Sequence, residues 1–169
     1  MPGGLLLGFY GRGSSLEYAE LLFSDGVRPA PAAPSVRIAV ALVDDPESVA
    51  GGHRIWAIPK QLAQFSWNEH DSARVAQAEV RWAAEVLRVS VTRFGPRCLL
   101  PVLGRFSGYD PGRAAWVRGF ITARPARVTI ELAPDGQLSA LQPRFSPVGL
   151  CGIARLRVAG PNQASPERS

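Results

Sequence analysis

The chain has 169 residues, of which 46% are apolar and 20% are charged, a composition typical of a globular protein with one core. No apolar run reaches the roughly 18–20 residues that a membrane span needs, and the first residues lack the basic segment of a secretory leader. We therefore expect one domain over residues 1–158, a disordered tail over residues 159–169, a cytoplasmic location and no membrane partner.

The net charge of +5 raises the question of a nucleic-acid partner. The basic residues are scattered singly, without a run of three and without the aromatic–basic motif of RNA-binding sheets. We expect the arginines to lie on solvated faces of strands, and we predict no nucleic-acid partner.

Apolar and polar residues alternate along most of the chain, which is the pattern of half-buried antiparallel strands. The expected strands cover residues 4–10, 16–23, 35–43, 62–68, 73–82, 87–92, 117–123, 127–132 and 154–158. Residues 103–113 are expected to form a long loop and residues 133–136 a turn. About nine strands in one domain predict a mainly β fold, either a barrel or a sandwich.

One helix signal interrupts the strands. Asp45 is expected to cap the helix and Pro46 to occupy its first position, with an acidic residue in the first turn. Gly51 and Gly52 are expected to end or loosen the helix. The chain then returns to extended structure, because Ile58 precedes Pro59 and a residue before proline avoids the helical region.

Lys60 is the only lysine, whereas the other 18 basic residues are arginines. Unlike arginine, lysine can lose its proton at accessible pH, and burial among apolar groups lowers the pKa of a lysine. The resulting neutral amine can attack a carbonyl carbon and form a Schiff base. Alternatively, Lys60 packs its stem on apolar residues and keeps its ammonium in water. Its apolar neighbours in sequence are Trp56, Ile58, Leu62, Phe65 and Trp67.

The string Trp-x-x-Pro-Lys-x-Leu-Ala-x-Phe over residues 56–65 resembles the signature of the acetoacetate decarboxylase-like family. Residues 18–22, Tyr-Ala-Glu-Leu-Leu, resemble a second strand of that family. The resemblance implies a closed, largely antiparallel acetoacetate decarboxylase-like β-barrel with a cone-like interior and one or two short helices. It also places the Schiff-base lysine of the family on Lys60.

The chain departs from the family pattern beside this lysine. In the decarboxylase a second lysine follows the first and lowers its pKa, but Gln61 stands at that position here. The Gly-Arg-Glu of the family is replaced by Gly52-His53-Arg54. Activation of Lys60 would therefore have to come from desolvation or from a nearby arginine such as Arg54.

Glu20 is the candidate acid. On an alternating strand it shares a face with Tyr18, so it can act as a proton shuttle or as the counter-ion of the lysine. An ion pair with an arginine at the rim of the barrel is the alternative. The predicted site thus has Lys60 and Glu20 as catalytic residues. The residues expected to bind substrate are Tyr18, His53, Arg54, Trp56 and Gln61.

No metal or cofactor is expected. His53 and His70 are the only histidines and have no ligand pattern around them. Cys98 and Cys151 are expected to be reduced, buried thiols, although a disulfide between them stays open.

The predicted function is a Schiff-base lyase acting on a small keto acid or related carbonyl compound. The alternatives are a non-catalytic barrel of the same family that binds a small apolar ligand, and an assembly subunit. A homo-oligomer is expected.

Overall fold

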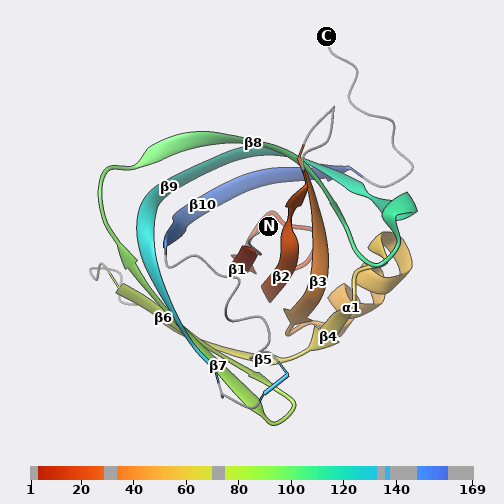
Figure 1. Cartoon of the computed structure of the whole chain (residues 1–169), viewed down its shortest axis with the longest axis horizontal. Helices are drawn as coiled ribbons and strands as arrows, with labels where there is room; N and C mark the ends of the chain where they lie inside the picture. Colours follow the sequence, from red (N-terminus) through yellow and green to blue (C-terminus); the bar gives the residue numbers. More distant parts are fainter. Residues whose placement is uncertain (1–3, 29–33, 70–74, 133–135, 138–147, 160–169) are drawn as a thin grey trace.

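In the computed structural model of the chain, one long sheet curls around a core and a short helix packs beside it (Figure 1). The structure describes residues 4–28, 34–69, 75–132, 136–137 and 148–159. The strands are β1 (Gly4–Tyr10), β2 (Tyr18–Arg28), β3 (Ser35–Val43), β4 (Lys60–Leu62), β5 (Gln64–Glu69), β6 (Val75–Trp82), β7 (Glu85–Arg93), β8 (Cys98–Ser107), β9 (Ala115–Glu131) and β10 (Val148–Ala159). The helical segments are α1 (Pro46–Gly51), the π-helical turn η1 (Gly52–Trp56) and the 3-10 turn η2 (Pro111–Arg113).

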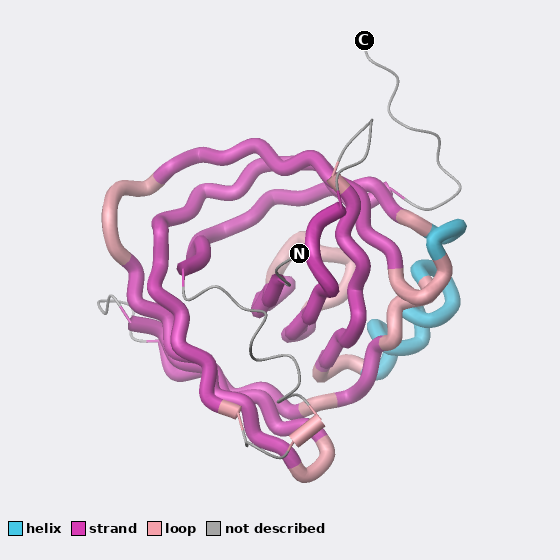
Figure 2. Tube along the Cα trace, in the orientation of Figure 1, coloured by secondary structure: helices cyan, strands magenta, loops and turns pink. Residues whose placement is uncertain are grey.

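The strands lie in the order β1-β2-β3-β8-β9-β7-β6-β5, with β10 beside β9 and β4 beside β3. β3 pairs in parallel with β4 and β8, and the other pairings are antiparallel. The fold is therefore mainly β, as predicted. The prediction of a closed barrel was wrong, because β1 and β5 end the order and no pairing between described strands joins them. The sheet is an open half-barrel (Figure 2).

Several strand predictions agree with the structure, and the main error concerns β8. β1 and β3 have the predicted bounds, whereas β9 continues through Pro125 and unites two predicted strands. Residues 103–113 are not one loop, since β8 extends to Ser107 and η2 follows. The apolar run of β8 does not alternate with polar residues and contains Pro101, so it lacks the pattern from which the other strands were predicted. The expected turn at 133–136 and the tail after Ala159 lie outside the described residues, apart from Gly136.

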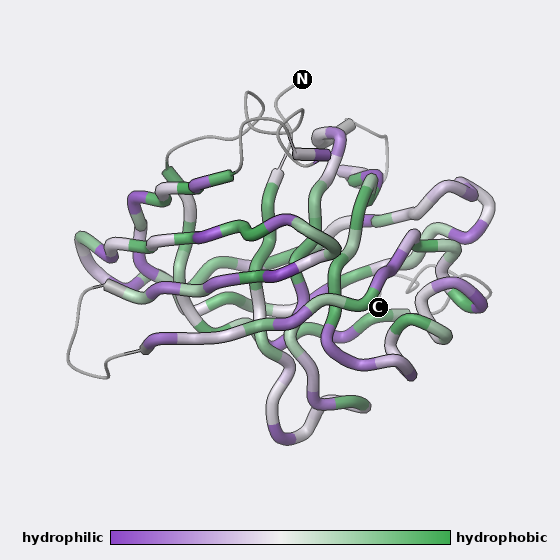
Figure 3. Tube along the Cα trace, turned by 90° about the horizontal axis from the view of Figure 1, so that it is seen from below, coloured by the Kyte–Doolittle hydropathy of each residue, from purple (hydrophilic) through white to green (hydrophobic). Residues whose placement is uncertain are grey.

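The main core lies on the concave side of the sheet. Its fully buried members come from four strands and follow the two-residue period. Hydrophobic and hydrophilic positions alternate along the strands in Figure 3. The fully buried members are Leu21, Phe23, Leu42, Val80, Leu87 and Val89. Each such side chain contributes about 1.5–3 kcal/mol of burial free energy.

A second apolar cluster lies on the opposite face of β2 and β3, because Leu22 alternates with the core residues Leu21 and Phe23. Ile38, Ala41 and Ile58 form its buried centre, with Leu22, Trp56 and Phe106 packed around them. This is the face against which η1 packs.

The helix begins as predicted. The carboxylate of Asp45 accepts a hydrogen bond of 2.9 Å from the Ser48 backbone N–H, and Pro46 follows the cap. The α-helix ends at Gly51, and the chain continues as η1 until Ala57, whose φ of 50° stops the helix. None of the described helices is long and apolar enough to cross a membrane.

The two thiols are free, as predicted, but the prediction that they are buried was wrong. Cys98 is exposed and Cys151 is half-buried, and both are free. They lie on β8 and β10, which flank β9 on opposite sides. Two strand spacings separate these strands by roughly 10 Å, so the cysteines cannot form a disulfide.

Candidate functional site

Lys60 is the first residue of β4 and lies opposite Ala41 of β3. The neighbouring peptide of Pro59 also contacts β3, since its carbonyl accepts a hydrogen bond of 3.4 Å from the Ala41 N–H. The side chain of Lys60 therefore projects towards the face covered by α1 and η1. It is buried, with 7% of its surface exposed.

Three side chains surround the amine of Lys60. Its Nζ lies 2.7 Å from Glu20 Oε1, and it donates hydrogen bonds to Ser48 Oγ at 2.9 Å and Tyr18 Oη at 3.3 Å. The same nitrogen lies 4.9 Å from the centroid of the Tyr18 ring. These partners come from β2 and α1, so the lysine links the sheet to the helix.

Glu20 has a partner for each of its oxygens. It is 3% exposed, and its Oε2 accepts a hydrogen bond of 2.8 Å from the hydroxyl of Tyr10. The Tyr10 ring stacks on that of Tyr18 at 4.6 Å. Burial raises the pKa of Tyr10 well above its usual value, and the charge of Glu20 adds to this shift. The phenol therefore stays protonated and remains a donor to Glu20.

Gly52 makes room for the lysine. A Cβ at this position would lie 2.5 Å from Lys60 Cδ and 2.8 Å from its Cγ, distances that non-bonded carbons do not reach. The helix can approach β4 this closely only because Gly52 has no side chain.

The other predicted site residues are dispersed. His53 Nε2 lies 2.8 Å from the carbonyl oxygen of Lys60, so it contacts the backbone and not the amine. Trp56 packs against Phe106, with ring centroids 5.8 Å apart, in the second apolar cluster. Gln61 is exposed and accepts a hydrogen bond from Trp82 Nε1 at 3.1 Å, on the other side of β4.

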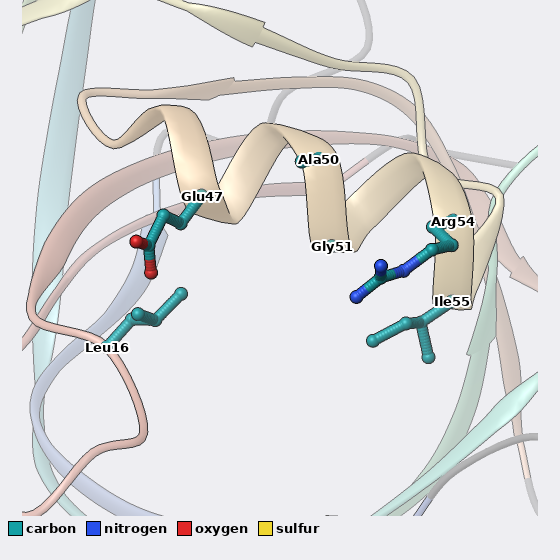
Figure 4. A pocket seen from close by; sticks show the side chains of 6 residues that line it. All are labelled: Leu16, Glu47, Ala50, Gly51, Arg54 and Ile55. Atoms are coloured by element: carbon teal, nitrogen blue, oxygen red, sulfur yellow. The ribbon is translucent and has the colours of Figure 1, made fainter.

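A cavity of about 410 Å³ lies along α1 and η1 (Figure 4). Arg54 and Glu47 provide its charged groups, and Arg54 points across it. Lys60 does not line the cavity, but two lining residues are close in sequence to residues that contact Lys60. Leu16 precedes Tyr18 by two residues, and Gly51 adjoins Gly52. Its lining residues are Leu16, Glu47, Ala50, Gly51, Arg54 and Ile55.

Two members of the cluster were missed by the sequence analysis. Tyr10 becomes visible only when β1 is paired with β2, because the register sets Tyr10 opposite Tyr18. Ser48 precedes Gly52 by four residues, so the helical period places both on the side that meets Lys60. Within the described residues, no group of three or more His, Cys, Asp or Glu side chains could hold a metal ion.

Comparison with known proteins yields similar structures only. No family model and no curated protein matches the chain. The enduracididine biosynthesis enzyme MppR complexed with pyruvate is 13% identical, with a TM-score of 0.53 over 86% of this chain and 67% of that one. Acetoacetate decarboxylase from Legionella pneumophila is also 13% identical, with a TM-score of 0.55 over 83% of this chain and 64% of the other.

These likenesses define the class of fold. The chain has an acetoacetate decarboxylase-like fold, as the resemblance in its sequence implied. It spans about two thirds of the length of the structures that it matches.

Proposed function

We propose that the chain is a Schiff-base lyase that acts on a small keto acid through Lys60. One observation carries the proposal, namely the buried Lys60 amine 2.7 Å from the buried carboxylate of Glu20. The pair provides a nucleophile and a proton acceptor in direct contact. The string around Lys60 and the fold support the same chemistry.

The steps follow from this contact. Glu20 takes a proton from the ammonium of Lys60, and the neutral Nζ attacks the carbonyl carbon of the substrate. Glu20 returns this proton to the hydroxyl of the adduct, so that loss of water gives a protonated imine. When the carboxylate is β to the carbonyl, the imine accepts the electron pair of the bond between the α carbon and the carboxylate as carbon dioxide leaves, and the product is an enamine. A proton taken from solvent and relayed by Glu20 then adds to the enamine carbon, and water releases the ketone and restores Lys60.

Tyr10 holds Glu20 in position for these transfers. Its hydroxyl donates a hydrogen bond to Oε2 of Glu20, so that Oε1 remains directed at the lysine. Ser48 and Tyr18 accept the other two protons of the ammonium, so the amine has a fixed direction before substrate arrives.

Gln61 does not argue against an activated lysine. Successive residues of a strand point to opposite faces, and Gln61 indeed contacts Trp82 on the side away from Glu20. A lysine at position 61 would project in that same direction. The environment of Lys60 on its own face therefore decides its reactivity.

The substrate class follows from the cavity along α1 and η1. Arg54 can bind a carboxylate there, with Leu16 and Ile55 as apolar walls. One similar structure, MppR, is described as complexed with pyruvate, which is a small keto acid. Because Lys60 does not line the cavity, α1 and η1 must shift for the carbonyl to reach Nζ, and Gly51 and Gly52 are the joint between them.

The second candidate is a non-catalytic module that binds a small apolar ligand. The observation in its favour is that all three protons of the Lys60 ammonium have acceptors within 3.3 Å. In that case the cluster only ties α1 to β2 and β4.

Borohydride trapping separates the two functions. The protein is incubated with pyruvate, acetoacetate and 2-oxobutanoate in turn, reduced, and digested for mass spectrometry. Because Lys60 is the only lysine, a reduced adduct in its peptide has one possible side-chain origin. The lyase predicts an adduct that is absent from Lys60→Arg. Failure of all three compounds to leave an adduct, with the protein folded, would refute it.

A further inference from the structure

The outer face of β8, β9 and β10 is apolar and basic, and no described element covers it. We call it the arginine face and define it by eight residues. Four are apolar and strongly exposed: Ile153 at 75%, Leu99 at 66%, Leu103 at 56% and Phe120 at 55%. The others are Arg118, Thr122, Arg155 and Arg157, all exposed. Leu99, Phe120, Thr122, Ile153 and Arg155 line a shallow groove of about 500 Å³ on it.

Three arginines on this face lack acidic partners within the described part of the chain. Arg118 and Arg157 are directly opposite one another in the β9–β10 register, and Phe120 is opposite Arg155. Like charges in directly opposed positions repel. Four arginines elsewhere in the sheet and its loops do have acidic partners, since Asp25 pairs with Arg37, Glu79 with Arg81 and Arg88, and Asp110 with Arg113.

β10 is also an edge strand. It pairs with β9 on one side, and no other described strand pairs with it. Its unpaired backbone groups form a template for a further strand. On the inner face of β10, Leu156 and Val158 are 40% and 49% exposed. Apolar surface is thus open on both faces of this strand.

We propose that the free edge of β10 binds an extended segment of a partner protein in which acidic and apolar residues alternate. The added strand would donate and accept backbone hydrogen bonds along β10. Its acidic residues would lie opposite Arg155 and Arg157. Its apolar residues would lie opposite Ala154 and Leu156 on the inner face, and opposite Ile153 on the outer face.

Other occupants fit the surface less well. Phe120 is the only strongly exposed aromatic residue on the arginine face, whereas single-stranded nucleic acid stacks on several aromatic rings. A lipid bilayer would leave the backbone groups of the open edge without hydrogen bonds. A second copy of β10 brings further arginines and no acid to the same place.

The test uses two labelled synthetic peptides in fluorescence anisotropy with the full chain. One contains Glu-Val-Glu-Val-Val, and its control contains Lys-Val-Lys-Val-Val. The acidic peptide should bind and the basic peptide should not. The double variant Arg155→Glu/Arg157→Glu should weaken binding of the acidic peptide by about tenfold. Arg12→Glu, a single charge reversal in the turn before β2, should leave binding unchanged, whereas each of Arg155→Glu and Arg157→Glu alone should weaken it.

Hydrogen exchange locates the contact. Binding should slow exchange of amides in residues 151–158 and leave β1, at the other end of the sheet, unaffected. Equal binding of both peptides, or acidic-peptide binding insensitive to the Arg155 and Arg157 reversals, would overturn the proposal. So would tighter binding of an oligothymidine or of phosphatidylserine vesicles to the same arginines, or self-association that these reversals abolish.

Discussion

Replacement of Gly52 by alanine tests how closely the helix approaches the lysine. The added Cβ would lie 2.5, 2.8 and 3.1 Å from Lys60 Cδ, Cγ and Cε. Lys60 cannot easily move aside, because Glu20, Ser48 and Tyr18 hold its amine. Overpacking of this kind costs about 1–3 kcal/mol, whereas the gain in helix propensity is about 1 kcal/mol. Gly52→Ala should therefore lower the free energy of unfolding by up to about 2 kcal/mol.

Gly51 provides a matched control. It has the same helical backbone conformation, and a Cβ there would meet nothing within 4 Å. Gly51→Ala should stabilise the protein by about 0.5–1 kcal/mol, which corresponds to about 1–4 °C in Tm for a chain of this size. The assay is urea denaturation of both variants. If Gly52→Ala is as stable as Gly51→Ala, the reasoning about the contact is wrong.

Three further predictions concern the cluster and the helix cap. Since the pKa of Tyr10 is raised in the folded protein, its contribution to stability is complete below the unfolded pKa of about 10 and is lost at higher pH by about 1.4 kcal/mol per pH unit. Tyr10→Phe should therefore flatten the fall of the urea midpoint between pH 9 and 11. An unchanged slope in this variant would contradict the raised pKa of Tyr10. Glu20→Gln leaves Lys60 buried without a counter-charge and should lower the free energy of unfolding by about 3–5 kcal/mol, much of which Lys60→Met should restore in the double variant. If the two single variants are additive in this double-mutant cycle, Glu20 and Lys60 do not interact. Asp45→Ala removes the cap of α1 and should cost about 1 kcal/mol by denaturation, while Glu47→Ala, which caps nothing, should cost less.

The sequence predicted the helix and most strands because their signals are local. The carboxylate of Asp45 bonds within its own turn, and the alternation in β3 depends only on which residues face the core. Most of β8 was missed because its apolar residues do not alternate with polar ones. The closure of the sheet was also predicted wrongly, since closure depends on pairing between β1 and β5, which are far apart in sequence.

In the site, too, the residues with a local sequence signal were predicted and those without one were not. Lys60 and Glu20 were both singled out, and the structure sets them 2.7 Å apart. Tyr10 and Ser48 carried no local signal, because a tyrosine in β1 and a serine in a helix are common in any packed structure. Gln61 was grouped with Lys60 by adjacency, although the two-residue period of β4 sends it to the other face.

The central claim is that the single lysine of this chain forms a covalent imine with a keto acid. It can be tested by NMR on protein labelled with carbon-13 at the lysine Cε, which gives one lysine signal because Lys60 is the only lysine in the sequence. Titration with pyruvate and with acetoacetate should produce a second signal from the imine, and Glu20→Gln should weaken or abolish it. A lysine signal that stays single and unshifted with every keto acid, in a folded protein, would contradict the claim and leave Lys60 as a structural ion-pair residue.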